Sequence, residues 1–225
     1  MTATDTMKRD QMNRRQQILG VFLALILVLS GASFSVAAQT PGLFGSTENR
    51  STNLTMFSQW NNMLARIGKN TMSGNNADKS ATASRGKDWQ KFLSGEKAKD
   101  ALAQIKDVNE YVNKISYVTD PVNYGVPDVW NTPDEFFMNN GDCEDYAVTK
   151  FISLKALGFP ADQMRVVAVQ DLNLKVGHAI LAVYVKDHVL ILDNQIKQVA
   201  DAAGIKHYKP VFSINETAWW RHTSQ

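Results

Sequence analysis

Two polar stretches in the first half of the chain carry apolar residues at three- and four-residue intervals, the spacing of amphipathic helices. The first series is Leu54, Phe57, Trp60, Leu64 and Ile67, and the second is Ala98, Leu102, Ile105, Val108, Val112 and Ile115. We expect the first helix to follow an N-cap at Ser51–Asn53. Residues 68–87 are rich in Asn, Ser, Lys and Gly and predict a long surface loop, whereas residues 120–127 predict an extended connector.

The middle of the chain contains two helix starts. Thr132–Glu135 has the form of a capping box with proline at the first helical position, which predicts a short helix. That helix ends at Asn139–Gly141, and Asp142 is then placed to cap a helix from Cys143 to about Leu157, which Gly158 stops. The second helix is apolar nearly all round, which is typical of a buried central helix.

Four runs after this helix have the composition of β-strands. They are Arg165–Gln170, Val176–Val185, Val189–Leu192 and Val211–Ile214. Helices followed by strands predict an α+β domain in which an antiparallel sheet packs on the Cys143 helix.

Residues 1–38 have the pattern of a secretory signal peptide. Arg14-Arg15 precedes the apolar run Ile18–Leu29, and small residues follow up to Val36-Ala37-Ala38. We expect cleavage after Ala38, export to the periplasm and a single domain over 39–225. The alternative is an uncleaved anchor, because the apolar segment could just cross a bilayer.

The composition excludes several functional classes. Of the 225 residues, 24 are basic and 22 acidic, and the expected signal segment holds four of the basic and two of the acidic ones. The remaining chain is balanced, so charge gives no case for binding nucleic acid. A single cysteine excludes an intrachain disulfide and any multi-cysteine zinc site.

That cysteine, Cys143, is the strongest candidate for chemistry. A lone cysteine is often a small buried hydrophobe, but the amides and dipole of a helix N-terminus favour the nucleophilic thiolate. A thiolate nucleophile needs a basic partner and the base needs an acceptor that orients it. His178 lies inside an apolar strand and Asp193 ends the next one. The other histidines are expected at the solvated surface: His188, His207 and His222.

The register of the two strands decides whether His178 and Asp193 can meet. A two-residue turn at Lys186-Asp187 would place Asp193 opposite Ile180, with its Cα roughly 7–8 Å from that of His178 on the same face. A turn centred one residue earlier would place them directly opposite. A register shifted by an odd number would send the two side chains to opposite faces.

Several stretches together resemble the bacterial transglutaminase-like cysteine peptidases, and specifically the LapG type of periplasmic adhesin protease. They are Asp128–Pro133, Asn140–Ala147, Gly177–Ala179 and Leu192–Asn194, within a likeness over roughly residues 50 to 215. The resemblance implies a papain/transglutaminase-like fold. It also implies Cys143 as nucleophile, His178 as base and Asp193 as orienting carboxylate.

The resemblance further implies calcium-dependent cleavage near the N-terminus of a large surface adhesin. Release of the adhesin would promote biofilm dispersal. The periplasmic domain of an inner-membrane cyclic-di-GMP receptor would restrain the protease. The expected metal ligands are Asp142, Glu144 and Asp145. Three carboxylates beside a thiol would raise the pKa of the thiol, and a calcium ion would offset that repulsion. Helix capping explains one or two of these acids without a metal.

Two alternatives remain open at this point. The same three residues could pass the acyl group to an amine, as in a transglutaminase or acetyltransferase. The chain could also be a catalytically silent exported domain that binds an envelope partner. The glutamine that papain-type enzymes place six residues before the nucleophile, as an oxyanion donor, is replaced by Phe137.

Overall fold

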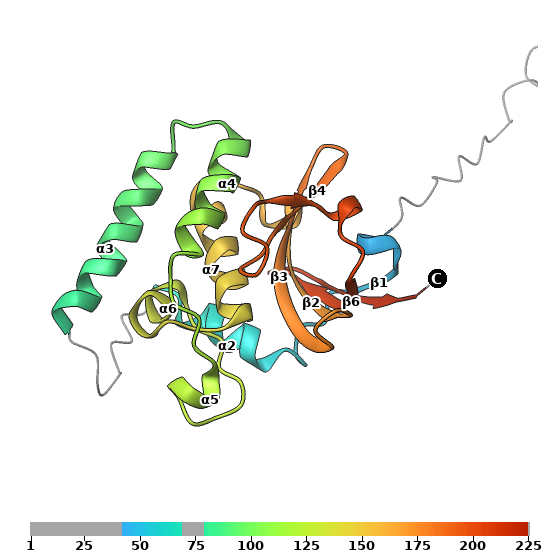
Figure 1. Ribbon diagram of the computed structural model, residues 1–225, viewed down its shortest axis with the longest axis horizontal. Coiled ribbons are helices and arrows are strands. Elements are labelled where there is room, and N and C mark those ends of the chain that lie inside the picture. The colour runs from blue at the N-terminus through green and yellow to red at the C-terminus, as the bar shows by residue number, and fades with distance from the viewer. Residues whose placement is uncertain (1–41, 69–78, 225) are drawn as a thin grey trace, which may run out of the picture. The chain divides into compact units, whose positions relative to one another are not determined.

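The computed structural model describes residues 42–68 and 79–224, so the expected signal segment 1–38 lies outside the described residues. The described part contains a seven-stranded antiparallel sheet in the order β1-β7-β6-β2-β3-β4-β5 (Figure 1). The strands are β1 (Thr47–Ser51), β2 (Met164–Asp171), β3 (Val176–Val185), β4 (His188–Leu192), β5 (Ala200–Asp201), β6 (Tyr208–Ile214) and β7 (Trp219–Thr223). Together with the helices, this sheet gives the α+β fold predicted from the sequence.

The two faces of the sheet belong to two separate apolar cores, because neighbouring residues of a strand point to opposite sides. Val166 and Leu181 lie in the larger core, which they share with the helices. Val167 and Ile180 lie in a smaller core on the other face. Two short 3-10 segments cover the smaller core: η1 (Leu43–Gly45) and η3 (Ala202–Gly204).

The helix α7 (Cys143–Ala156) is the centre of the helical layer. It packs on β3, and α4 and α6 pack on it (Figure 1). Val148, Phe151 and Leu154 are fully buried along it, as its apolar composition predicted. The other helices are α2 (Ser58–Arg66), α3 (Lys79–Glu96), α4 (Ala101–Val112), α5 (Asp120–Asn123) and α6 (Pro133–Asn139), with a 3-10 segment η2 (Ala161–Gln163) before β2.

The predicted N-cap at Ser51–Asn53 is wrong. Ser51 is the last residue of β1, and α2 begins only at Ser58. The Oδ1 atom of Asn53 instead accepts a hydrogen bond from the backbone N–H of Thr55 at 3.1 Å. The pattern of the segment alone could not show this, because β1 forms by pairing with β7 at the far end of the chain.

Two further segments are more helical than expected. The stretch 68–87, predicted to be a loop, is helical from residue 79, because it continues into α3, which Trp89 anchors in the core. The connector 120–127 opens with the single-turn helix α5. Within the described residues, we find no helix with the length and apolar character needed to cross a membrane.

Candidate active site

A tight connection between α6 and α7 places Cys143. Asn140 has a φ of 63° and a ψ of −166°, a strained backbone conformation that residues other than glycine rarely adopt. At Gly141 a Cβ atom would overlap the carboxylate of Asp145. The same carboxylate accepts a hydrogen bond from the backbone N–H of Asp142 at 3.3 Å. As predicted, Asp142 is therefore the N-cap and Cys143 the first residue of α7.

The Cys143 thiol is partly exposed and faces β3. Its sulfur donates to Oε2 of Glu144 at 3.1 Å and accepts a hydrogen bond from the backbone N–H of Ala179, the residue after His178. Burial raises the pKa of the Cys143 thiol strongly, the Glu144 carboxylate and Asp142 raise it further, and the Ala179 amide lowers it. Burial and the two acids thus outweigh the Ala179 amide, so the thiol form is favoured.

His178 and Asp193 meet as the register analysis required. Val185 faces His188 and Leu181 faces Leu192, which is the pairing expected for a turn at Lys186-Asp187. His178 Nε2 lies 2.9 Å from Asp193 Oδ1, and the two residues are only 5% and 1% exposed. Because an ionised carboxylate can only accept, Nε2 carries the proton of a neutral His178, and Nδ1 is then the basic nitrogen.

Two residues that the sequence analysis did not identify complete the surroundings of Asp193. The backbone N–H of Gln195 donates to Oδ1 at 2.9 Å, and the hydroxyl of Tyr208 donates to Oδ2 at 2.6 Å. Burial alone would raise the pKa of Asp193, but the hydrogen bonds from His178, Tyr208 and Gln195 hold it below its ordinary value. The Gln195 side-chain amide also lies 3.4 Å from His178 Nδ1. Tyr208 stands in a polar stretch whose pattern gives no sign of this role.

Two of the remaining histidines have polar partners of their own. His188 is exposed and pairs with Asp201 at 2.6 Å, as a surface residue would. The surface position expected for His222 is wrong. His222 is 6% exposed, and its two ring nitrogens lie 2.8 Å from the hydroxyl of Ser46 and 2.9 Å from that of Ser213. Pairing of β7 between β1 and β6 buries it.

Acidic side chains gather beside the thiol, including two that the sequence analysis missed, Asp120 and Asp128. Three sets each have ligand atoms within 4.8 Å of one another: Asp142 with Cys143 and Glu144, Asp120 with Asp142 and Asp145, and Asp120 with Asp128 and Glu144. Burial and the neighbouring Asp142 carboxyl raise the pKa of Glu144 to about 9, and burial raises that of Asp120 to about 6. Bringing these carboxylates together disfavours their ionised forms unless a cation neutralises them.

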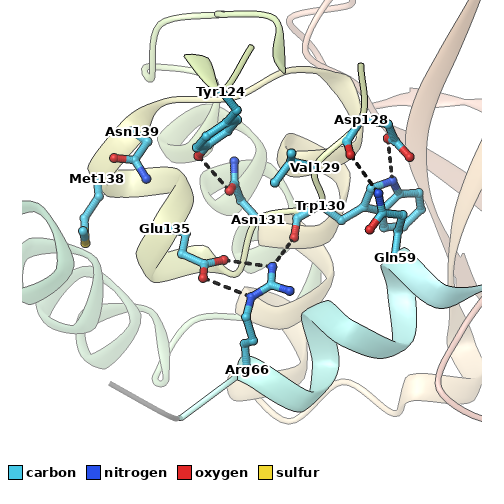
Figure 2. A pocket seen from close by; sticks show the side chains of 10 residues that line it. All are labelled: Gln59, Arg66, Tyr124, Asp128, Val129, Trp130, Asn131, Glu135, Met138 and Asn139. Carbon is cyan, nitrogen blue, oxygen red and sulfur yellow. Dashed lines mark hydrogen bonds and ion pairs between the residues drawn. The ribbon is translucent and has the colours of Figure 1, made fainter. Parts of the chain in front are cut away.

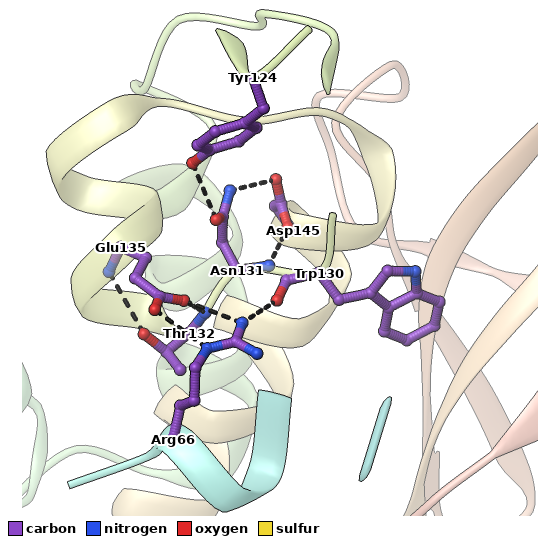
Figure 3. Close-up of polar contacts among 7 residues, drawn as sticks. All are labelled: Arg66, Tyr124, Trp130, Asn131, Thr132, Glu135 and Asp145. Atoms are coloured by element: carbon purple, nitrogen blue, oxygen red, sulfur yellow. Dashed lines mark hydrogen bonds and ion pairs between the residues drawn. The ribbon is translucent and has the colours of Figure 1, made fainter. Parts of the chain in front are cut away.

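Asp145 differs from the other acids because its oxygens already have several donors (Figure 3). The backbone N–H of Asn131 donates to Oδ1 at 2.7 Å and its side-chain amide donates to Oδ2 at 2.8 Å. Tyr124 in turn donates to the Asn131 carbonyl at 2.9 Å. Asp145 therefore joins the first turn of α7 to the segment before α6.

A cavity of about 320 Å³ opens on the outer side of this connection (Figure 2). Arg66 of α2 spans it, donating to both oxygens of Glu135 at 3.1 Å and to the backbone carbonyl of Trp130 at 2.6 Å. Trp130 packs edge-on against Trp60 at 6.1 Å and donates to Asp128 at 3.1 Å. It therefore both packs against the core and lines this cavity.

Comparison with known proteins gives a consistent result. The family model for bacterial transglutaminase-like cysteine proteinase (BTLCP) matches residues 77–223. LapG of Legionella pneumophila is 34% identical over 62% of this chain and 79% of its own, with a TM-score of 0.58. Its calcium-bound form is 33% identical over 64% of this chain and 84% of its own, also with a TM-score of 0.58. Its EGTA-treated form is 34% identical over 62% of this chain and 77% of its own, with a TM-score of 0.57. No curated protein matches the chain.

Proposed function

Because this chain belongs to the bacterial transglutaminase-like cysteine proteinase family and is a cysteine peptidase, we propose that Cys143, His178 and Asp193 are its nucleophile, base and orienting carboxylate. One observation carries this assignment. The buried pair of His178 and Asp193 lies at the point of β3 where the Ala179 amide contacts the sulfur of Cys143. With Nε2 held by Asp193, Nδ1 is the basic nitrogen of His178 that we propose takes the thiol proton.

In the proposed reaction, the thiol proton passes to Nδ1 of His178 and the Cys143 sulfur attacks the peptide carbonyl carbon. The new C–S bond gives a tetrahedral intermediate, and the backbone N–H of Cys143 is placed to donate to its oxyanion. The C–N bond then breaks as His178 returns the proton to the leaving amine. Water activated by His178 hydrolyses the acyl-enzyme, which restores the thiol. Asp193 holds the imidazole in one tautomer throughout.

We propose calcium as the resident ion of the acidic cluster. The residues fit this ion, since carboxylate oxygens are its preferred ligands, and Asp120 Oδ1 and Asp142 Oδ1 are buried with no hydrogen-bond partner among the described residues. Asp142 and Glu144 would hold it with Asp120 and Asp128, while Asp145 supports the loop and can add an oxygen. A bound ion would neutralise the carboxylates beside the thiol and so favour the thiolate.

We further propose that the substrate is the N-terminal region of a large surface adhesin, cleaved in the periplasm after export by the signal segment 1–38. The likeness to LapG and the motif of residues 140–147 support this substrate class. Cleavage would release the adhesin and promote biofilm dispersal. The proposed inhibitory partner is the periplasmic domain of an inner-membrane cyclic-di-GMP receptor, which would sequester the protease.

Incubation with the N-terminal segment of the adhesin from the same organism tests the reaction. We expect the purified protein to cut the segment with calcium, to stop with EGTA, and to recover with excess calcium. Cys143→Ala should abolish cleavage, whereas full activity in this variant would reject the nucleophile. Glu144→Gln should weaken the response to calcium, compared with Glu110→Gln at an exposed acid of α4. Mass analysis of products with an added amine separates hydrolysis from amine transfer.

Two further measurements address location and control. N-terminal sequencing of the exported protein should begin at Gln39, and retention of residues 1–38 would instead indicate an anchor. Adding the receptor's periplasmic domain should reduce cleavage in proportion to complex formed. Unchanged cleavage at saturating receptor domain would remove that partner from the proposal.

A further inference from the structure

The hydroxyl of Tyr208 is the third donor to the carboxylate of Asp193. Tyr208 is the first residue of β6, distant in sequence from Cys143 and His178, and is 4% exposed. Its hydroxyl lies 2.6 Å from Oδ2, while His178 Nε2 and the Gln195 backbone N–H both contact Oδ1. The two oxygens of the carboxylate therefore have different partners. Tyr208 holds the oxygen that faces away from the imidazole.

The direction of this hydrogen bond follows from the chemistry of the pair. An ionised carboxylate has no proton to give, so the phenol donates and Asp193 accepts. Burial and the Asp193 carboxylate raise the pKa of Tyr208, so the phenol keeps its proton across the working pH range. Without the hydroxyl, Oδ2 would be a buried anionic oxygen lacking this donor, and the carboxylate could turn about its Cβ–Cγ bond.

The ring of Tyr208 is fixed by its surroundings independently of any substrate. Its ring centroid lies 6.1 Å from that of Phe44, which it meets edge-on, and 4.3 Å from that of His207, to which it is tilted. The backbone of Tyr208 pairs with Asp171 of β2. Its centroid lies 5.8 Å from that of His178. The hydroxyl is thus presented to Asp193 by the sheet and by the smaller apolar core.

We propose that Tyr208 is a positioning residue that sets the orientation of the Asp193 carboxylate and, through it, the imidazole of His178. This inference rests on the proposed roles of Asp193 and His178. Tyr208 transfers no proton and contacts no reacting atom. It acts by keeping Oδ1 directed at Nε2, which leaves Nδ1 as the basic nitrogen of the imidazole. A misplacement of about 1 Å in such a group can cost up to about a hundredfold in rate.

The test compares Tyr208→Phe with Tyr184→Phe. Both changes remove one hydroxyl and keep the ring, and both residues line the same cavity of about 620 Å³. Tyr184 stacks on Arg165 at 4.7 Å, away from Asp193, which makes it the matched control. In the calcium-loaded enzyme, Tyr208→Phe should lower kcat by about 10- to 100-fold with KM within about twofold. Tyr184→Phe should retain kcat within about twofold. A kcat in Tyr208→Phe equal to that of the control would overturn the inference.

A second readout does not need the substrate. The Nε2 proton of His178, hydrogen-bonded to Asp193, gives its own NMR resonance. It should shift or broaden in Tyr208→Phe and stay in place in Tyr184→Phe, with both variants shown to be folded by thermal unfolding. An unmoved resonance in Tyr208→Phe rejects the positioning role even in an active peptidase. A moved resonance in a chain that cleaves no adhesin segment supports the positioning role and rejects the proposed substrate instead.

Discussion

Replacing Lys150 with methionine should stabilise the protein. Lys150 lies in the middle of α7, is 0% exposed, and its Nζ atom has no hydrogen-bond partner among the described residues. The aromatic ring of Tyr146 lies 5.7 Å from Nζ. Burial, opposed by the negative charge of Asp193, lowers the pKa of Lys150 to about 7. Methionine has a similar length and no charge, so it can fill the same space at no cost of desolvation.

The size of the effect follows from the two pKa values of Lys150. A pKa of about 7 in the folded state against 10.5 in the unfolded chain corresponds to about 5 kcal/mol against folding at pH values below 7. The penalty decreases as the pH rises from 7 towards 10.5, because in this range the unfolded chain still binds a proton that the folded protein has lost, and stability then rises with pH. The penalty is about 2 kcal/mol at pH 9. Since relaxation reduces such values, we expect Lys150→Met to gain about 1–4 kcal/mol at pH 7.

Urea unfolding of both proteins at pH 7 and pH 9, at constant calcium and with a reductant, measures this difference. The gain in free energy of unfolding should fall by about half at the higher pH. Lys155→Met is the control, because Lys155 lies on the same helix with a half-exposed ion pair to Glu216. It should change stability by less than about 1 kcal/mol. Lower stability of Lys150→Met at pH 7, or a gain independent of pH, would refute the reasoning.

Three other substitutions have expected outcomes. Gly141→Ala should reduce both stability and peptidase activity, because its Cβ would overlap the Asp145 carboxylate; equal Tm and kcat would contradict the model of this turn. Asn131→Ala should lower the free energy of unfolding by about 2–4 kcal/mol in urea, since it removes the side-chain donor from the buried Asp145. Lys186→Gly should raise stability by about 0.5–1 kcal/mol in the same assay, because Lys186 has a φ of 52° in the β3–β4 turn.

The central part of the site could be predicted because local rules determine it. The N-cap at Asp142 sets where α7 starts, so the position of Cys143 follows from the sequence. The two-residue turn at Lys186-Asp187 fixes the register of β3 and β4, and alternation of side chains then puts His178 and Asp193 on one face. Each of these steps uses residues that are close together in the chain.

The rest could not be predicted because it depends on contacts between distant segments. Tyr208 reaches Asp193 only because β6 lies next to β2 in the sheet order. Asp120 joins the acidic cluster because the chain after α4 pairs with the loop before α7, where Val118 N–H donates to the Gly141 carbonyl at 2.9 Å. His222 is buried by strands whose pairing its own sequence does not indicate. Patterns of polarity report exposure along one segment, not which segments become neighbours.

Two features that cost folding free energy lie on one helix, α7. At the start of α7, burial and the acids Glu144 and Asp142 raise the pKa of the Cys143 thiol. Two turns later, Lys150 is buried with no hydrogen-bond partner within the described part of the chain. Selection for stability alone would remove both, since a neutral side chain at either place would avoid the free-energy cost of burying a charge. Their charges act on Cys143 and on Asp193 respectively. Local violations of folding rules are typical of functional sites. Because both of these violations lie on α7, they support the Cys143 thiol as the centre of the chemistry. The cavity beside Arg66 is not supported in this way.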